Sequence, residues 1–365
     1  MKILHILFDW KFTGPAEPML DLCVELKRAG CEVSLACKMP PPDANISLLQ
    51  KAKGRGLKPI CDFALNKRPN LLDNLADIKR LSKFLRENRI DIIHTHQTHD
   101  HLLGGIAAKL SGSKTKVVRT NYSAEPINSL LLNELTDAQI VFSKLAHSPY
   151  KTSLINPAME LERYNPEAHV EGAKRVRAKY GIGQDDFVLG VVARIQRHRR
   201  FDVLLKGIKL VSEKLPNLKV LIVGRGTHRE EVAVEPAKRL GLDGTVIFTG
   251  YLKGDDYLDT VAAFDAIIFL VPGSDGTCRA LREAMAMAKP AIGADRGMIP
   301  EIVDDGKTGI IIRDDPLGIV AGIIALATEH KFSKKMGLAA REKALRCYSI
   351  KEQAKRVVEI YAGLF

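Results

Sequence analysis

The sequence lacks the features that define several classes of protein. It has no run of about 18 or more apolar residues, which argues against a helix that spans a membrane. The opening MKILHILFDW has only a short apolar run and no small-residue cleavage site follows it, so it does not resemble a secretory signal. The six cysteines show no CxxC spacing, which predicts reduced cytosolic thiols instead of a disulfide framework or a zinc site.

Two further binding signatures are also missing. No G-x-G-x-x-G motif follows the first expected strand, where FDWKFTGPAE holds a single glycine, so a dinucleotide oxidoreductase is disfavoured. No RNP-like, helix-turn-helix or zinc-finger pattern is present, so we expect no nucleic acid partner. The net charge of +12 and the pI of about 9.3 therefore indicate another acidic partner, either a phosphorylated ligand or an anionic membrane surface.

The organisation of the chain predicts two domains of α/β class. At 365 residues it exceeds the size at which one hydrophobic core usually stops growing. Short apolar runs alternate with amphipathic helical segments, and this succession occurs twice, which is typical of parallel sheets covered on both faces. We predict a doubly wound, Rossmann-like domain at 1–165, completed by a C-terminal helix at 349–365, and a second one at 166–348, with a cleft between them.

In such sheets ligands bind beyond the carboxyl ends of the strands. The loop VVARIQRHRR follows one expected strand and carries five basic side chains, counting His198; guanidinium groups of this kind clamp phosphates. LVPGSDGTCRALREAMAMAKP leads from another strand through a glycine-containing turn into a helix expected to begin near Thr277, whose free amides favour an anion. Glu283 lies among apolar residues of this helix, so its carboxylate needs hydrogen-bonding partners, and sugar hydroxyls are suitable ones.

The spacing Asp275-x7-Glu283, followed by AMAMAKPAIGAD and MIPEIVDDGKTGIII, resembles the retaining, nucleotide-sugar-dependent glycosyltransferases of family 4. The resemblance covers essentially the whole chain, because the opening strand with GPAEPMLDLCVELKRAGCEVSLAC, then IDIIHTH, VARIQRHRRFDVLLKGI, LKVLIVGRG and VIFTGYL occur in the family's order. It implies the GT-B architecture of two facing Rossmann-like domains. It also implies transfer of a sugar from a nucleoside-diphosphate-sugar with retention of anomeric configuration.

The resemblance implies roles for single residues. Arg194 and Arg199 would hold the donor's diphosphate, and Asp275 would face hydroxyls of the donor sugar. Glu283 would bind the ribose hydroxyls. The remaining donor contacts would come from backbone amides and loops, namely Gly276, Thr277 and Cys278 at the helix start, Gly224, Gly226 and 249–253 beside the nucleobase, and Gly14 near the phosphate.

Several positions depart from the family's pattern. Its Gly-Gly is Gly14-Pro15 here, which removes one amide donor and fixes one φ angle. Asp275 replaces a glutamate and reaches less far. The other replacements are Arg199 for lysine, Arg200 for glycine, Ala158 at a linker position where Asn-Gly is common, and Tyr122 for histidine. Because the basic pair and both carboxylates survive in kind, we expect a divergent but active enzyme.

No metal or other cofactor is expected. The sequence has no convincing Asp-x-Asp metal motif, and its acidic pairs at 255–256, 304–305 and 314–315 are typical of turns and helix starts. The largest electrostatic need in glycosyl transfer is to stabilise the charge on the departing nucleoside diphosphate, and two guanidinium groups with a helix N-terminus can do this. The nucleoside-diphosphate-sugar would then be the co-substrate.

The stretch IIHTHQTHDH holds four histidines. His94 and His96 point to the same side of an expected strand, and a metal site could use this pair with His99 or His101. No cysteine and no clearly fixed third ligand lie nearby, which argues against the metal. The family comparison matches His-Thr-His alone. We therefore expect His96, and after it His94, to hydrogen-bond near the donor sugar and the acceptor, and His99 and His101 to be loop residues.

The acceptor is expected to be a glycan or a lipid-linked glycan. SDGTCRALREAMAM is similar to the lipopolysaccharide-core transferases, so the lipopolysaccharide core is one candidate. The helical segment LADIKRLSKFLREN either packs its apolar face on the sheet or, with the basic KAKGRGLK, rests on an anionic membrane. This predicts a cytoplasmic protein, at the inner face of the cytoplasmic membrane in the second case. The alternatives are a nucleotide-sugar epimerase of the same architecture and a catalytically silent nucleotide-sugar-binding homologue.

Overall fold

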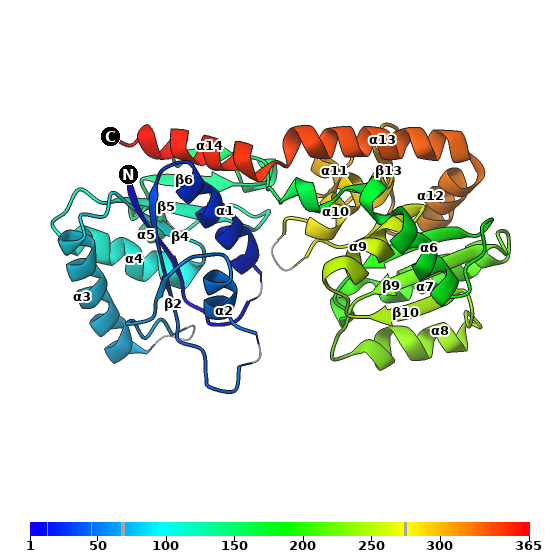
Figure 1. Ribbon diagram of the computed structural model, residues 1–365, viewed down its shortest axis with the longest axis horizontal. Helices are drawn as coiled ribbons and strands as arrows, with labels where there is room; N and C mark the ends of the chain where they lie inside the picture. Colours follow the sequence, from blue (N-terminus) through cyan, green and yellow to red (C-terminus); the bar gives the residue numbers. More distant parts are fainter. Residues whose placement is uncertain (13, 45, 67–69, 274–275) are drawn as a thin grey trace. The chain divides into compact units, whose positions relative to one another are not determined.

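The computed structural model describes residues 1–12, 14–44, 46–66, 70–273 and 276–365. The chain divides into two compact units. Unit 1 is Met1–Met159 with Ser349–Phe365, and unit 2 is Glu160–Tyr348. Each unit contains one parallel sheet flanked by helices, which confirms the predicted α/β class and the two Rossmann-like folds (Figure 1). In the described part of the chain, no helix is both long and apolar enough to cross a membrane.

The described part of unit 1 is built on a seven-stranded sheet in the order β3-β2-β1-β4-β5-β6-β7, with parallel pairing throughout. Its strands are β1 (Lys2–Leu7), β2 (Glu32–Cys37), β3 (Pro59–Ile60), β4 (Ile92–Thr95), β5 (Lys116–Asn121), β6 (Ala138–Val141) and β7 (Thr152–Leu154). The strand order grows in opposite directions from β1 and β4, so these neighbours form the topological switch point of the sheet.

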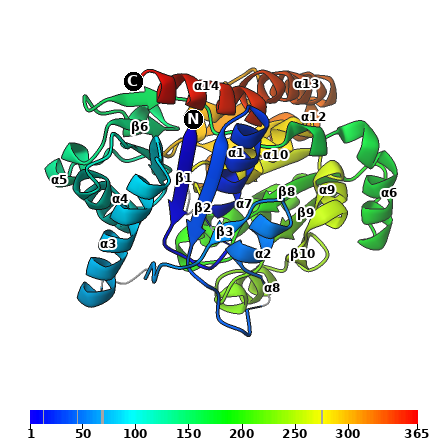
Figure 2. The same cartoon turned by 60° about the vertical axis from the view of Figure 1, so that its left-hand side comes forward.

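Helices cover both faces of this sheet (Figure 2). One side is formed by α3 (Leu71–Glu87) and α4 (Thr98–Leu110), and the other by α1 (Ala16–Arg28), α2 (Leu48–Lys53) and the C-terminal α14 (Ile350–Ala362), with the short α5 (Leu130–Glu134) before β6. Alternate side chains of β1 serve the two cores: Leu4 and Ile6 pack with α3 and α4, and Leu7 packs with α1 and α2. The C-terminal helix α14 packs against α1, so it belongs to unit 1.

For helix α3 the sequence left two interpretations open, packing of its apolar face on the sheet or contact with an anionic membrane. Leu81 and Leu85 are fully buried, and Ile78 and Phe84 pack against the same core. The apolar face of the segment therefore packs on the sheet, as the first of the two interpretations predicted.

The described part of unit 2 has a six-stranded parallel sheet in the order β10-β9-β8-β11-β12-β13. Its strands are β8 (Phe187–Val192), β9 (Leu218–Val223), β10 (Val246–Gly250), β11 (Ala266–Phe269), β12 (Ala291–Ala294) and β13 (Gly309–Ile312). Its helices are α6 (Val170–Lys179), α7 (Phe201–Ser212), α8 (Glu235–Arg239), α9 (Gly254–Ala262), α10 (Arg279–Ala286), α11 (Ile299–Ile302), α12 (Pro316–Thr328) and α13 (His330–Cys347). The switch point of this sheet lies between β8 and β11.

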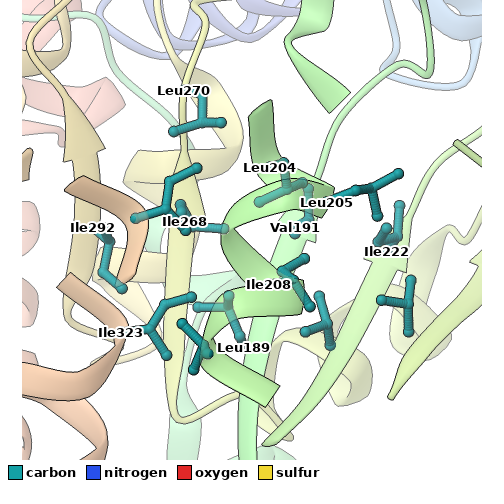
Figure 3. Packing of buried hydrophobic residues seen from close by; sticks show 14 of the residues in the cluster. Leu189, Val191, Leu204, Leu205, Ile208, Ile222, Ile268, Leu270, Ile292 and Ile323 are labelled. Carbon is teal, nitrogen blue, oxygen red and sulfur yellow. The ribbon is translucent and has the colours of Figure 1, made fainter. Parts of the chain in front are cut away.

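The core of unit 2 joins α7 and α12 to the sheet. Figure 3 shows Leu204, Leu205 and Ile208 of α7 among side chains of the strands, including Leu189 and Ile268. The strands are buried on both faces, which is why they appear in the sequence as nearly continuous apolar runs. This packing fixes the carboxyl ends of β8 and β11, from which the candidate site is built.

Candidate functional site

The loops that follow β8, β9 and β10 in unit 2 are joined by backbone hydrogen bonds. The amide of Ala193 donates to the Val223 carbonyl (3.1 Å), and that of Ile195 donates to Arg225 (3.1 Å). The amide of Gly224 donates to the carbonyl of Gly250 (2.9 Å). The pairing of the strands thus continues past their carboxyl ends and holds the loop that carries the arginines.

The GRG segment is required for this close approach. A Cβ atom placed on Gly224, whose φ is +153°, would lie 1.9 Å from the carbonyl oxygen of Ala193. One placed on Gly226 would lie 1.7 Å from that of Ile195. The close approach of the two backbones therefore requires glycine at both positions, independently of any contact with a nucleobase. Beyond them, the guanidinium of Arg225 lies over the exposed ring of Tyr251, 4.6 Å from its centroid.

Arg194 and Arg199, predicted as a pair, have different surroundings. Arg194 is exposed, and among the described residues it has no hydrogen bond or ion pair. Arg199 is partly buried, and its Nη1 donates to the carbonyls of Val271 (3.0 Å) and Pro272 (2.6 Å). Arg199 thus ties the loop after β8 to the loop after β11 across the switch point, while Arg194 presents its guanidinium to solvent.

Arg200 explains why glycine is usual at its position. Its backbone is left-handed, with φ 60° and ψ 30°, and it caps the start of α7. Its side chain donates to Asp314, from Nε to Oδ1 (3.3 Å) and from Nη2 to the carbonyl (3.0 Å). A glycine would adopt this backbone without strain, and the pair with Asp314 offsets part of the strain here.

The turn before α10 differs in part from the prediction. The helix begins at Arg279, with Cys278 as its left-handed N-cap (φ 49°), and not near Thr277. The amide of Gly276 donates to the Gly273 carbonyl (2.9 Å), and its contact with a diphosphate stays a prediction. Thr277 and Cys278 are buried at the helix start. Asp275 lies outside the described residues, and its role stays a prediction.

Glu283 lies buried in α10 and accepts three hydrogen bonds from protein groups. Its Oε1 accepts from the hydroxyl of Tyr164 and from Nε of Arg279, both at 2.7 Å. Its Oε2 accepts from the hydroxyl of Tyr257 at 2.5 Å. Burial acts to raise the pKa of Glu283, but Arg279 and the two hydroxyls outweigh it and lower the pKa, so the carboxylate is ionised. The partners that we expected from sugar hydroxyls are thus supplied largely by the protein.

In unit 1, Gly14 lies in the exposed turn between β1 and α1. Its φ is +55°, and no atom lies within 4 Å of a Cβ placed there. Pro15 follows as the N-cap of α1. Gly14 therefore serves the turn geometry, and its predicted position near a phosphate stays a prediction.

His94 lies at the switch point of unit 1 with both ring nitrogens occupied. Nδ1 bonds the hydroxyl of Tyr361 from α14 (2.5 Å), and Nε2 bonds that of Thr120 from β5 (2.7 Å). The ring is fully buried. Burial, with His96 and His5 beside it, holds the pKa of His94 well below its usual value, so the ring is neutral. Neither nitrogen is left for a ligand in this arrangement, and the contact of His94 with the donor stays a prediction.

His96, just beyond β4, is bonded in the same way. Its Nδ1 bonds the hydroxyl of Tyr122 (3.0 Å), and its Nε2 bonds Nδ1 of His5 (2.9 Å). The rings of His94 and His96 stack with centroids 4.6 Å apart, so the two do point to the same side. Burial, with His5 beside it, also lowers the pKa of His96 far below its usual value. A sugar hydroxyl would have to displace Tyr122 or His5 to reach this ring.

The third ring of the cluster is His5, and not His99 or His101. Among the described residues, His5, His94 and His96 are the one group of potential metal ligands whose donor atoms lie within 4.8 Å of one another. Five of their six ring nitrogens already take part in hydrogen bonds, and a metal bound by all three rings would have to break some of them. His99 bonds Asn74 (3.3 Å), and His101 bonds Thr95 and the Leu132 carbonyl.

His99 and His101 lie in a helix, so the prediction that they are loop residues is wrong. Both belong to α4, which begins at Thr98. At this helix start the carboxylate of Asp100 accepts a hydrogen bond from the backbone amide of Gln97 (2.7 Å). The segment leaves β4 and turns into a helix almost at once.

The sequence interpretation missed several of the residues that complete these two clusters. His5 could have been found, because it pairs with His94 in the register of β1 and β4. Arg279, four residues before Glu283 on the same helix, also follows a readable rule. Tyr164 and Tyr257 come from other elements and carry no local signal.

Comparison with known proteins gives a consistent result. Residues 173–343 match the family described as Glycosyl transferases group 1, and residues 14–157 match the family described as Glycosyltransferase Family 4. The chain is 25% identical over 317 residues to N-acetyl-alpha-D-glucosaminyl L-malate synthase of Bacillus anthracis, covering 80% of this chain and 78% of that protein.

A second relative covers nearly all of both chains. The UDP-Gal:alpha-D-GlcNAc-diphosphoundecaprenol alpha-1,3-galactosyltransferase of Escherichia coli is 21% identical over 388 residues, covering 100% of this chain and 97% of that protein. Among solved structures, Anabaena Alr3699/HepE in complex with UDP has a TM-score of 0.82 and 17% identity, with 100% of both chains covered. That likeness shows that the two chains share the fold.

Proposed function

Because the chain belongs to glycosyltransferase family 4, with the GT-B fold and a nucleotide sugar as donor, we propose that it moves the sugar to a lipid-linked glycan with retention of configuration and without a metal ion. One observation carries the proposal. The exposed guanidinium of Arg194 lies where ligands bind in sheets of this kind, at the carboxyl end of β8 beside the switch point of unit 2.

The proposed mechanism places positive charge where negative charge develops. As the bond to the donor sugar breaks, charge accumulates on the nucleoside diphosphate. Arg194 would pair with this diphosphate, while Arg199 fixes the loop that carries Arg194 through its bonds to Val271 and Pro272. The start of α10 would add the positive end of its dipole. Asp275 would face hydroxyls of the donor sugar. A preorganised group of this kind contributes about 10²–10³-fold in rate.

Uridine diphosphate is the nucleotide that we propose first. The Escherichia coli relative carries UDP-Gal in its name. Arg225 and Tyr251, at the ends of β9 and β10, form a stacked pair on which a base could lie. Glu283 would accept a hydrogen bond from the ribose.

The lipid-linked acceptor is supported by surface chemistry. Leu71, Leu72 and Leu75, in the first turns of α3, are 75%, 79% and 55% exposed. Lys79 and Lys83 are exposed further along the same helix, and the chain carries a net charge of +12. Apolar side chains beside cations suit an anionic membrane at its cytoplasmic face. Lipid-linked glycans, of which the lipopolysaccharide core is one, are made from such a surface.

Three experiments test the proposal. Thermal shift with UDP, GDP and ADP in excess EDTA should show stabilisation by at least one of them, and turnover of the matching nucleotide sugar should be the same in EDTA and in magnesium. Loss of turnover in EDTA, with recovery on adding a divalent metal, would contradict the metal-independent part. NMR of the product should show the anomeric configuration of the donor.

The alternatives give different products. An epimerase would release an epimerised nucleotide sugar when no acceptor is added, and a silent homologue would bind the nucleotide without hydrolysing or transferring the sugar. Transfer to L-malate or another small acceptor would contradict the proposed lipid-linked acceptor. It would not contradict the proposed transfer of a sugar from a nucleotide sugar.

A further inference from the structure

Two free cysteines lie side by side at one edge of the sheet of unit 1. The Sγ atoms of Cys37 and Cys61 are 3.9 Å apart. Cys37 is the last residue of β2, and Cys61 directly follows β3, the edge strand of the sheet. The two strands pair in parallel with Ala36 opposite Ile60, so the two cysteines are the next residues in this register.

The spacing of the two backbones suits a disulfide. Neighbouring strands lie about 4.7–4.9 Å apart, and disulfides join Cα atoms that are about 4.4–6.8 Å apart. Nζ of Lys38 donates to Oδ1 of Asn66, which also joins the segments that follow the two strands. The sulfurs of Cys37 and Cys61 can therefore reach bonding distance by rotation of their side chains, without separation of the strands.

The two thiols differ in how they can react. Cys37 is fully buried, whereas Cys61 is partly exposed. Burial, together with the neighbouring Cys61, raises the pKa of the Cys37 thiol, so Cys37 stays protonated. Cys61 is therefore the residue that meets an oxidant first, and Cys37 is the residue that completes the bond.

We propose that Cys37 and Cys61 are a modification site, at which hydrogen peroxide produces a reversible disulfide. The thiolate sulfur of Cys61 attacks one peroxide oxygen, the O–O bond breaks, and the departing hydroxide takes up the proton that the thiol released. Cys61 is then a sulfenic acid, and one water has formed. The sulfur of Cys37 attacks the sulfur of Cys61, the S–O bond breaks, and the hydroxide leaves with the proton of Cys37 as a second water. Two thiols thus lose two electrons to one peroxide.

The cross-link holds a very short edge strand. β3 has two residues, Pro59 and Ile60, and it pairs with β2 alone. A disulfide between the two strands closes the segment 38–60, which contains α2, and so restricts the unfolded chain. Oxidation should therefore stabilise unit 1, and reduction should reverse this effect.

The test follows the cross-link and the stability of unit 1 together. The protein is reduced, freed of reductant and treated with hydrogen peroxide, and its peptides are mapped by mass spectrometry without further reduction. A linked pair of peptides with Cys37 and Cys61 is expected, and the thiols of the denatured protein should fall by two, from six to four. Trp10, the single tryptophan, lies in unit 1, and its fluorescence should report a melting temperature about 5 °C higher, reversed by dithiothreitol.

Cys61→Ser should form no cross-link and show no rise in melting temperature. Cys31→Ser is the matched control, because Cys31 is also half-buried but precedes β2, at the end opposite Cys37, and this variant should keep both effects. Oxidation of Cys61 without a cross-link, its linkage to another cysteine, or a cross-link that leaves the melting temperature unchanged would overturn the inference. So would an equal rise in Cys61→Ser. None of these measurements involves a nucleotide, so they are independent of the proposed function.

Discussion

The switch points of the two sheets have the same topology and opposite chemistry. In unit 1, between β1 and β4, the rings of His5, His94 and His96 are buried, neutral and bonded to one another or to hydroxyls. In unit 2, between β8 and β11, Arg194 remains exposed and Arg199 ties two loops together. The same fold thus pairs its polar groups with one another in unit 1 and leaves the guanidinium of Arg194 exposed in unit 2. The position of a residue in a Rossmann-like sheet predicts where a ligand site can form. Whether a polar side chain there is available to a ligand depends on the hydrogen bonds that it already makes.

The largest expected difference in stability is between two glycine-to-alanine variants, one in each unit. Gly226→Ala places a Cβ atom 1.7 Å from the Ile195 carbonyl, so the loops after β8 and β9 must separate, at a cost on the order of 4 kcal/mol. Gly14→Ala in unit 1 meets no atom within 4 Å and costs only the strain of its positive φ, about 1 kcal/mol. Urea unfolding of both variants measures the difference. Equal destabilisation would show that the loops of unit 2 are not held as described.

The second largest effect is expected from mildly acidic pH, which should destabilise unit 1 more than unit 2. The buried histidines of unit 1 have folded pKa values below their unfolded value of 6.5, lowered to about 3 for His5 and to about 4 for His101. The unfolded chain therefore binds more protons below pH 6.5, and stability is lost as the pH falls through that value. Four rings lose stability in this way, namely His5, His94, His96 and His101. Asp100 acts in the opposite direction, because burial raises its pKa to about 8, and it offsets the loss of about one ring.

The net loss should be about 3 kcal/mol between roughly pH 6.5 and 5.5. In unit 2 the pKa of Glu283 is lowered from 4.5, so its contribution is lost only at lower pH. The single tryptophan, Trp10, lies in unit 1, and its fluorescence during urea unfolding reports this loss. His5→Leu should reduce the loss by about 1 kcal/mol. A flat profile over this range would contradict the account of unit 1 as a neutral histidine stack.

The smallest expected effect concerns Arg200. Arg200→Ala loses the pair with Asp314 and keeps the left-handed backbone, whereas Arg200→Gly loses the pair and relieves the strain. The glycine variant should be more stable than the alanine variant by about 0.5–1 kcal/mol, as judged by thermal unfolding. The opposite order would mean that the backbone of Arg200 carries no strain.

The sequence predicted the parallel sheets and the loops after the strands because both follow local patterns. The residues that complete each cluster could not be found in this way. Tyr164 lies 119 positions from Glu283, and His5 lies 91 positions from His96, so only the folded chain brings them together. The family resemblance singled out Glu283 and His94 in the sequence. It did not show that protein groups already occupy most of their hydrogen-bonding positions.

The central claim is that the switch point of unit 2 binds the donor's diphosphate. Its most direct test is turnover of the donor by Arg194→Ala, with Arg197→Ala as the matched control from the same loop. Arg197 is exposed and already paired with Glu231, at 3.0 Å and 2.9 Å. Arg194→Ala should lower turnover by about 100-fold or more without changing the melting temperature, while Arg197→Ala stays within about twofold of the natural protein. Natural turnover by Arg194→Ala would contradict the claim.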